Sequence, residues 1–185
     1  SWVQSVVIAV VLALFIRHFF FEPFRIPSGS MIPTLRIGDK ILVNKFMFGM
    51  RVPFTFRKFW IFRRPSRGDV IVFRFPKGER KDLVKRIVGL PGERIKISDD
   101  GKILVNGSPV TGDSFIATNR YYNDPTAGPY ATTHEITVPD DSYFVLGDNS
   151  RNSKDGRYHG FVPLSHIKGK VICVWWPVWH ARKVR

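Results

Sequence analysis

The chain has 185 residues, a hydrophobic content of 44% and a formal net charge of +14. This length allows one full domain, and the hydrophobic content excludes an intrinsically disordered tail. The charge indicates an anionic partner. Because the basic residues are spread along the chain, we expect a membrane surface and no nucleic acid. The single cysteine, Cys173, excludes an intramolecular disulfide and is interpreted as a buried apolar residue of a strand.

The N-terminus is apolar. Residues 1–16 carry no charge and are mostly Val, Ile, Leu, Ala and Phe. Sixteen helical residues span about 24 Å, short of a hydrocarbon core of roughly 30 Å, but the helix reaches about twenty residues if Arg17 snorkels. We predict a transmembrane anchor helix over residues 1–22, in preference to a cleaved leader or a buried core helix. Because the chain begins with neither Met nor a charged flank, we expect it to be part of a longer protein.

From residue 38 onward the pattern is that of β-structure. Segments rich in Val, Ile and Phe are separated by Gly, Pro and Asp, and no long segment shows helical periodicity. We predict strands at residues 40–45, 69–75, 83–88, 94–97, 103–105, 135–138, 143–146 and 171–176. The predicted fold is mainly β, a coiled antiparallel β-sheet domain over residues 23–185 behind one N-terminal helix. A looser, peripheral insertion is expected at about residues 99–133.

Between the apolar N-terminus and the first predicted strand lies the segment Pro27-Ser28-Gly29-Ser30-Met31-Ile32-Pro33-Thr34-Leu35. Its two prolines and its glycine exclude a helix and favour a stiff, irregular and extended backbone. A flexible linker is the ordinary interpretation of this composition, but a solvated linker would not carry the flanking Phe24 and Ile37. A serine held on a stiff segment beside an apolar surface is a candidate nucleophile if a base lies near.

Lys85 is the candidate base. Strand alternation places it on one face of the strand with Leu83 and Ile87, and Arg86 on the other face. Such neighbours remove water from the amine and lower its pKa from about 10.4, so that a neutral lysine can act as a general base. The alternative is a solvated lysine on an edge strand, the more common state of a strand lysine.

A third polar cluster covers residues 147–157. Asp148, Ser150 and Asn152 have the alternate spacing of a calcium loop, but Ser153 stands where glycine is needed and no glutamate closes the loop. A network of side-chain to backbone hydrogen bonds is therefore the better interpretation of this segment.

Together these segments resemble the type I signal peptidases of bacteria, which are membrane-bound serine–lysine proteases that remove signal peptides. The resemblance runs from about Phe24 to about Lys170. It rests on four stretches in the family's order, at residues 28–35, 67–73, 85–93 and 147–157. A lysine at position 85, rather than a histidine, resembles the bacterial and organellar branches and not the enzyme of the endoplasmic reticulum.

The resemblance implies a role for each matched residue. Ser30 would be the nucleophile and Lys85 the general base. Ser28 would complete an oxyanion hole beside the backbone N–H of Ser30, and Ser153 would orient the lysine amine. The groups that hold the geometry would be Asp148, Asp155 and Arg157. Shallow pockets for small substrate side chains would be lined by Phe24, Ile26, Ile41, Val72 and Val84. The substrate would lie as an added strand along residues 83–85, with no cofactor and no metal.

The resemblance also implies partners and a location. Preproteins with signal peptides would be the substrates and membrane lipid a further contact. The catalytic domain would lie on the extracytoplasmic side of the inner (plasma) membrane, behind a single-pass or multi-pass anchor. Arg17 and Arg25, counted alone, would place the domain in the cytoplasm. The count lacks the N-terminal flank, so we follow the resemblance.

Two other functions stay open at this point. One is a self-cleaving serine–lysine repressor-type protein, for which Ala127-Gly128 is the only Ala-Gly pair in the chain. The other is a non-catalytic, membrane-anchored binding domain. A related question concerns residues 46–62, where seven aromatic residues alternate with three basic ones. We interpret this stretch either as a hairpin packed on the core or as a surface that dips into lipid headgroups.

Overall fold

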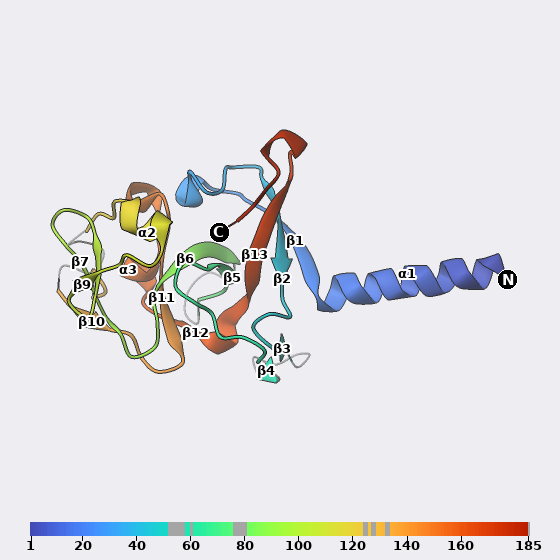
Figure 1. Cartoon of the computed structure of the whole chain (residues 1–185), viewed down its shortest axis with the longest axis horizontal. Coiled ribbons are helices and arrows are strands. Elements are labelled where there is room, and N and C mark those ends of the chain that lie inside the picture. Colours follow the sequence, from blue (N-terminus) through green and yellow to red (C-terminus); the bar gives the residue numbers. More distant parts are fainter. Residues whose placement is uncertain are drawn as a thin grey trace.

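A computed structural model describes residues 1–51, 58–59, 61–75, 81–123, 126, 129–131 and 134–184. Its N-terminal helix, α1 (Trp2–Phe19), extends away from a β-rich body (Figure 1). Among the described residues, no helix combines the length and the apolar character needed to cross a membrane. The predicted helix is confirmed, but the transmembrane character expected of it has no support in the structure.

The helix ends earlier than the predicted residue 22. Phe21 already belongs to strand β1 (Phe21–Arg25), which pairs antiparallel with β2 (Lys40–Asn44). Strand β1 lies at the edge of the main sheet, a position that tolerates Pro23 because one side of the strand needs no partner. Residues 21 and 22, which the sequence analysis assigned to the anchor helix, therefore belong to the edge strand.

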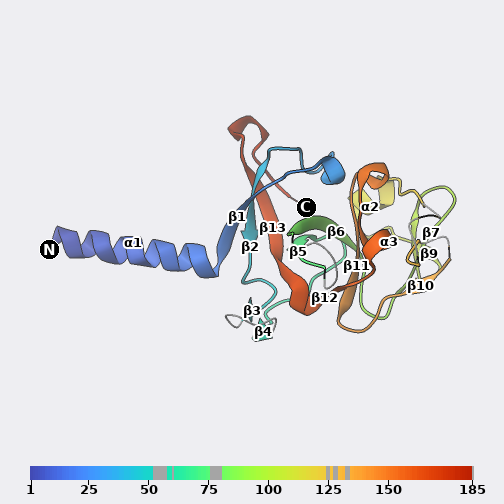
Figure 2. The same cartoon turned by 180° about the vertical axis from the view of Figure 1, so that it is seen from behind.

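The main sheet has eight strands in the order β1-β2-β13-β5-β6-β11-β12, with β14 added on β13. The pairings within it are antiparallel. Strand β13 (Ile167–Trp176) pairs with β2, β5 and β14, and its register shifts at several points. Such irregularities bend and twist a strand, and the sheet curls around them (Figure 2). The remaining members are β5 (Val70–Phe73), β6 (Leu83–Gly89), β11 (Ser142–Leu146), β12 (Val162–Pro163) and β14 (Arg182–Lys183).

A smaller sheet of four strands has the order β10-β7-β8-β9. Its strands are β7 (Arg94–Ile97), β8 (Ile103–Val105), β9 (Ser108–Pro109) and β10 (Ile136–Thr137). Asn106 and Gly107 join β8 to β9 with φ angles of 51° and 82°. A two-residue hairpin turn with both φ angles positive favours Asn-Gly, so this turn follows directly from the sequence. A separate pair consists of β3 (Met50–Arg51) and β4 (Lys58–Phe59).

The buried apolar side chains form three clusters. Strand β5 contributes to two of them, because Val70 and Val72 join the first cluster while Ile71 and Phe73 join the second. A strand buried on both faces needs an uninterrupted apolar sequence, which residues 70–73 provide. The third cluster lies between the smaller sheet and strand β11, where Ile95 and Phe144 are buried.

Each of the eight predicted strands has a counterpart in the structure. Strands β7 and β8 have the predicted bounds, whereas β13 begins four residues before the predicted residue 171. The sequence analysis missed β1, β9, β12 and β14, which are short or contain proline. Cys173 lies in a strand as expected, but it is only half-buried.

The aromatic stretch at residues 46–62 is described only in part, since residues 52–57 and 60 lie outside the described chain. Phe48 is fully buried in the second core cluster. The ring of Phe46 stacks on that of Phe62 at a centroid distance of 4.2 Å, and Phe62 is exposed. The packed interpretation therefore holds for Phe48, and contact of the other rings with lipid stays a prediction.

Candidate active site

Ser30 lies on the loop between β1 and β2. It occupies a single 3-10 turn, η1 (Gly29–Met31), which is a departure from the extended backbone expected for this segment. Ser28 and Ile32 on either side are extended. The carbonyl oxygen of Ser30 accepts a hydrogen bond from the backbone N–H of Asn149 at 3.0 Å, and the Asn149 side-chain amide donates to the carbonyl of Gly29 at 3.1 Å. The third polar cluster thus holds the backbone of the serine turn.

Lys85 meets Ser30 in the interior. Its Nζ atom lies 2.6 Å from the Oγ atom of Ser30, although the two residues are 55 positions apart in the sequence. Lys85 is 3% exposed and Ser30 is 8% exposed. Strand β6 carries the lysine, and at Lys85 it pairs with Ile71 of β5, whereas its pairing with β11 begins at Arg86. The structure therefore brings the candidate nucleophile and the candidate base into direct contact.

Burial lowers the pKa of Lys85 from 10.5 to about 8. The main cause is loss of water around the amine, which disfavours the charged form. The carboxylates of Asp155 and Asp148 act in the opposite direction, while Arg157 reinforces the decrease. The expected direction of the shift is confirmed, with carboxylates from the third cluster as a partial offset.

Each of these carboxylates is bound by an arginine. Asp148 accepts two hydrogen bonds from Arg86, from Nε to Oδ1 and from Nη2 to Oδ2, both at 2.9 Å. The hydroxyl of Thr34 also donates to Asp148. Asp155 accepts from Nε and Nη2 of Arg157, again at 2.9 Å each. Since the carboxylates are paired elsewhere, the amine of Lys85 can remain neutral without leaving a buried anion unpaired.

Arg157 also ties the third cluster together. It donates to the backbone carbonyl of Ser150 at 2.7 Å and to the Ser150 hydroxyl at 3.0 Å. Asp155 accepts from the backbone N–H of Gly147 at 2.9 Å and caps the short helix α3 (Gly156–His159). The predicted network of side-chain to backbone hydrogen bonds is confirmed. Asp155 and Arg157 form its buried centre.

Arg86 is a site residue that the sequence analysis did not single out. It is fully buried, and besides Asp148 it donates to the carbonyl of Gly68 at 2.8 Å. Its guanidinium carbon lies 4.3 Å from the ring centroid of Phe115. A charged residue beside Lys85 in an otherwise apolar strand signals a buried counter-ion, but the sequence does not say which carboxylate supplies it.

Within the expected insertion, residues 113–123 make contacts with the residues around the site. These residues include the helix α2 (Ser114–Thr118), whose Phe115 covers Arg86. The Asn119 side chain donates to the carbonyl of Asp148 at 3.0 Å, and the backbone N–H of Tyr122 donates to the Ser150 hydroxyl at 2.9 Å. The insertion therefore packs behind the buried ion pairs.

The side chains of Ser153 and Ser28 do not make the contacts that the resemblance implies for them. The Ser153 hydroxyl is buried and has no hydrogen-bond partner in the described part of the chain, so the expected bond to Lys85 is not formed. It packs against Gly147, where a Cβ atom would lie 2.1 Å from the Ser153 hydroxyl and 2.7 Å from the Ser30 carbonyl. Ser28 is exposed, and its hydroxyl caps no backbone N–H of η1.

The five candidate pocket residues gather in the first core cluster, which also contains Met31 beside the nucleophile. Three of them are closed from solvent, namely Ile26, Ile41 and Val72. The other two, Phe24 and Val84, are half-buried and pack on that cluster. Phe24 and Val84 are thus the partly exposed members of this set, and Ile26, Ile41 and Val72 are its buried members.

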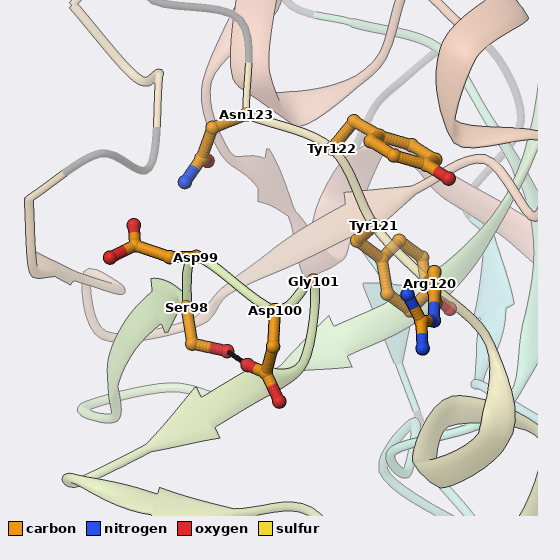
Figure 3. A pocket seen from close by; sticks show the side chains of 8 residues that line it. All are labelled: Ser98, Asp99, Asp100, Gly101, Arg120, Tyr121, Tyr122 and Asn123. Atoms are coloured by element: carbon orange, nitrogen blue, oxygen red, sulfur yellow. Dashed lines mark hydrogen bonds between the residues drawn. The ribbon is translucent and has the colours of Figure 1, made fainter.

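A separate hollow of about 300 Å³ lies beside the smaller sheet (Figure 3). It is lined by the turn between β7 and β8 and by residues 120–123. Within this lining, the hydroxyl of Ser98 donates a hydrogen bond to Asp100. None of its lining residues is a candidate for the chemistry at Ser30.

Comparison with known proteins identifies the family of the chain. The family model described as signal peptidase, peptidase S26, matches residues 1–176. The chain belongs to this signal peptidase family. Two relatives from its signal peptidase I branch come from Pseudomonas fluorescens and Pseudomonas aeruginosa. Each is 37% identical over a segment that covers 90% of this chain and 69% of the relative.

Other members of the family extend the comparison. A probable signal peptidase I-2 from Synechocystis is 36% identical over 96% of this chain and 75% of its own length. The crystal structure of a signal peptidase I from Enterococcus faecalis shows 34% identity, covering 58% of this chain and 97% of that one at a TM-score of 0.47. Membership in the signal peptidase family rests on the sequence matches.

Loss of one member of a buried ion pair should strongly destabilise the fold. We predict that Asp155→Asn lowers the free energy of unfolding by about 3–5 kcal/mol, because Arg157 is left buried with an unpaired charge. Asp141→Asn is the matched control. Asp141 pairs with Arg64 at 3.2 Å, both side chains are more than half exposed, and the change should cost at most about 1 kcal/mol. Equal losses in urea unfolding would contradict the buried network.

The lowered pKa of Lys85 should appear in the pH dependence of stability. Between the folded value of about 8 and the unfolded value near 10.5, only the unfolded state holds the proton, so stability rises with pH in this window. Below pH 8 the full penalty, roughly 3 kcal/mol, opposes folding. We predict that the wild-type protein gains stability relative to Lys85→Met from pH 8 to pH 10. A stability difference between the two proteins that stays flat over this pH range would argue against the lowered pKa.

Proposed function

We propose that the chain is a serine endopeptidase that removes signal peptides from preproteins, with Ser30 as the nucleophile and Lys85 as the general base. The observation that carries this proposal is the 2.6 Å contact between Ser30 Oγ and Lys85 Nζ inside the protein. A serine hydroxyl is a weak nucleophile by itself and needs a base within hydrogen-bond reach. Family membership supplies the class of reaction and of substrate.

The proposed chemistry has two stages. The neutral amine of Lys85 accepts the hydroxyl proton while Ser30 Oγ bonds to the carbonyl carbon before the cut. The tetrahedral intermediate collapses to an ester on Ser30, and the lysine ammonium donates its proton to the departing amine. Water then adds to the ester while losing a proton to Lys85, and the lysine ammonium returns this proton to Ser30 Oγ as the signal peptide leaves. Ser28 and the backbone N–H of Ser30 are the proposed donors to the oxyanion.

The surroundings of the lysine suit this task. A base works best when its pKa lies near the working pH, and a value of about 8 leaves a useful neutral fraction near neutrality. The buried hydroxyl of Ser153 is the proposed group to orient the amine once the substrate is bound. Its lack of a partner among the described groups leaves it available for such a bond.

The preprotein segment is proposed to bind as an additional strand. Strand β11 pairs with β6 at residues 86, 87 and 89, and no described strand pairs with residues 83–85 on that side. A peptide added there would reach the Ser30–Lys85 pair from the free edge of β6. Phe24 and Val84 would contact its side chains, and the floor of Ile26, Ile41 and Val72 would leave room for small ones only.

We also propose that the protein works at a membrane, with its catalytic domain on the extracytoplasmic side of the inner membrane. The support is the exposed apolar surface of α1, where Val7, Ile8 and Val11 are each more than half exposed, together with the net charge of +14. Basic groups attract anionic lipid headgroups, and an exposed apolar helix associates with acyl chains. A multi-pass arrangement has no support among the described residues.

The two alternative functions are weaker. The self-cleaving repressor-type interpretation depends on Ala127-Gly128, which lies outside the described residues, and the family match does not favour it. A non-catalytic binding domain would have no use for a buried lysine in contact with a serine hydroxyl. Cleavage of a peptide that ends in Ala-x-Ala, with and without Ser30, separates these cases.

Both members of the dyad should be essential for turnover. We predict that Ser30→Ala and Lys85→Ala each lower kcat by at least about 10³-fold while the folded structure is kept, because each removes one half of the proton transfer. The measurement is peptide cleavage together with circular dichroism. Lys96→Ala, a strand lysine of the smaller sheet, is the control and should keep wild-type activity. Turnover that survives in Lys85→Ala would refute the proposed base.

The pH dependence follows from the same lysine. The base is active when deprotonated, so kcat/KM should rise about tenfold per pH unit up to the pKa of about 8 and level off above it. In Lys85→His, any residual activity should rise at lower pH, near the roughly 6.5 of histidine. If the rise of activity with pH occurs at the same pH in Lys85→His as in the wild type, another group is responsible for the titration.

Pocket size should control the cleavage site. We predict that Val84→Ala and Ile41→Ala admit larger side chains at the first and third positions before the cut, since both shorten branched side chains around the proposed pockets. The measurement is cleavage of a peptide library by each variant. Val145→Ala makes the same change in the second core cluster and should leave the preference unaltered. If the cleavage preference is unchanged in both pocket variants, Val84 and Ile41 do not line the substrate pockets.

A further inference from the structure

The last described residues fold back onto the catalytic loop. After β13 the chain turns (Figures 1 and 2), forms the 3-10 turn η5 (Val178–His180), and adds strand β14 to the sheet. The backbone N–H of Val184 donates to the carbonyl of Ile172 at 2.9 Å. We call residues 178–184 the C-terminal strap. The family model ends at residue 176, so the match assigns no role to this segment.

Arg182 connects the strap to the serine loop. Its Nη2 atom donates to the backbone carbonyl of Pro33 at 3.1 Å and also to that of Thr34. These carbonyls follow the nucleophile closely in the sequence. The hydroxyl of Thr34 is bound from the other side, because it donates to Asp148 and accepts from Arg86 at 3.2 Å. Thr34 is thus held between the strap and the buried ion pair beside Lys85.

His180 extends the connection to the far end of the loop. Arg182 Nη1 contacts His180 Nε2, and a guanidinium can only donate, so Nε2 is the acceptor. The ring proton therefore sits on Nδ1, which donates to Asp39 Oδ1 at 3.0 Å. The other oxygen of Asp39 accepts from the backbone N–H of Arg36 at 2.9 Å. A chain of hydrogen bonds from Arg182 through His180 to Asp39 therefore spans the loop between Ser30 and β2.

The strap also fills the core under the nucleophile. Val184 is 4% exposed and belongs to the same cluster as Met31 and Leu35. Met31 follows Ser30 directly, and the backbone N–H of Leu35 donates to the carbonyl of Met31 at 2.8 Å. The polar contacts of the strap with the loop are therefore backed by apolar packing at its end.

We propose that the C-terminal strap positions the nucleophile, with Arg182 and His180 as positioning residues that hold the Ser30 loop against Lys85. The inference rests on the proposed role of Ser30. Reacting groups must lie within about 3–3.5 Å in the correct orientation, and a displacement of about 1 Å can cost roughly 10²-fold in rate. The hydrogen bonds of Arg182 and His180 go to the serine loop, to Asp39 and to each other, and not to residues 83–85, so substrate binding should be spared.

The test compares five substitutions in the full chain, Arg182→Ala, Arg182→Lys, His180→Ala, His180→Gln and Lys183→Ala. Lys183 lies on the same short strand and is exposed, which makes it the matched control. We expect Arg182→Ala and His180→Ala to lower kcat at least about tenfold with KM changed less than about twofold. Arg182→Lys keeps one donor to the carbonyls, and His180→Gln keeps a donor and an acceptor, so each should restore part of kcat.

Hydrogen exchange gives a second readout that does not depend on activity. The amides of Leu35 and Gly38 are bonded within the loop and to Ile26, and they should exchange faster in Arg182→Ala than in Lys183→Ala at unchanged thermal stability. If Ser30 is not the nucleophile, Ser30→Ala stays active while this exchange result stands, so the two proposals can fail separately. Wild-type kcat and exchange in Arg182→Ala, or a loss confined to thermal stability with faster exchange throughout the chain, would overturn the positioning role.

Discussion

The site depends on burying an amine beside a hydroxyl without giving that amine a counter-ion. Lys85 is closed from solvent, and the loss of water is the main cause of its lowered pKa. Two carboxylates lie close enough to raise the pKa again, yet each is bound by its own arginine through two hydrogen bonds. The paired charges cancel locally, so the neutral amine remains accessible near physiological pH. The two ion pairs therefore allow the lysine amine to stay neutral and also stabilise the fold.

The same ion pairs join parts of the chain that are far apart in the sequence. Asp148 binds Arg86 on β6 and Thr34 on the serine loop, so one carboxylate sets the distance between the loop and the lysine strand. Asn149 next to it holds the serine turn by its backbone and side chain. The insertion covers this junction from behind through Phe115 and Asn119. In the proposed mechanism, the position of Ser30 results from these contacts together and from no single one.

The sequence predicted much of this site because its signals are local or belong to a family pattern. The β-strands follow from apolar runs between turn residues, and Ser30 and Lys85 follow from the stretches at residues 28–35 and 85–93 that resemble the family. The partner of Arg86 could not be predicted, since ion pairing across 62 positions depends on the tertiary fold. The missing Ser153–Lys85 bond reflects side-chain packing around Gly147. The end of α1 at Phe19 reflects pairing of β1 with β2, and a strand partner outweighs local apolar character.

The most direct measurement of the central claim is the titration of the Lys85 amine itself. In protein labelled with ¹³C at the lysine ε-carbon, the Lys85 signal can be assigned by its loss in Lys85→Arg and followed from pH 6 to pH 11. The buried dyad predicts a midpoint near 8 for Lys85, well below the ordinary lysine value of about 10.4. A Lys85 midpoint at that ordinary value would contradict it, because the amine would then be protonated at neutral pH and unable to take the proton of Ser30.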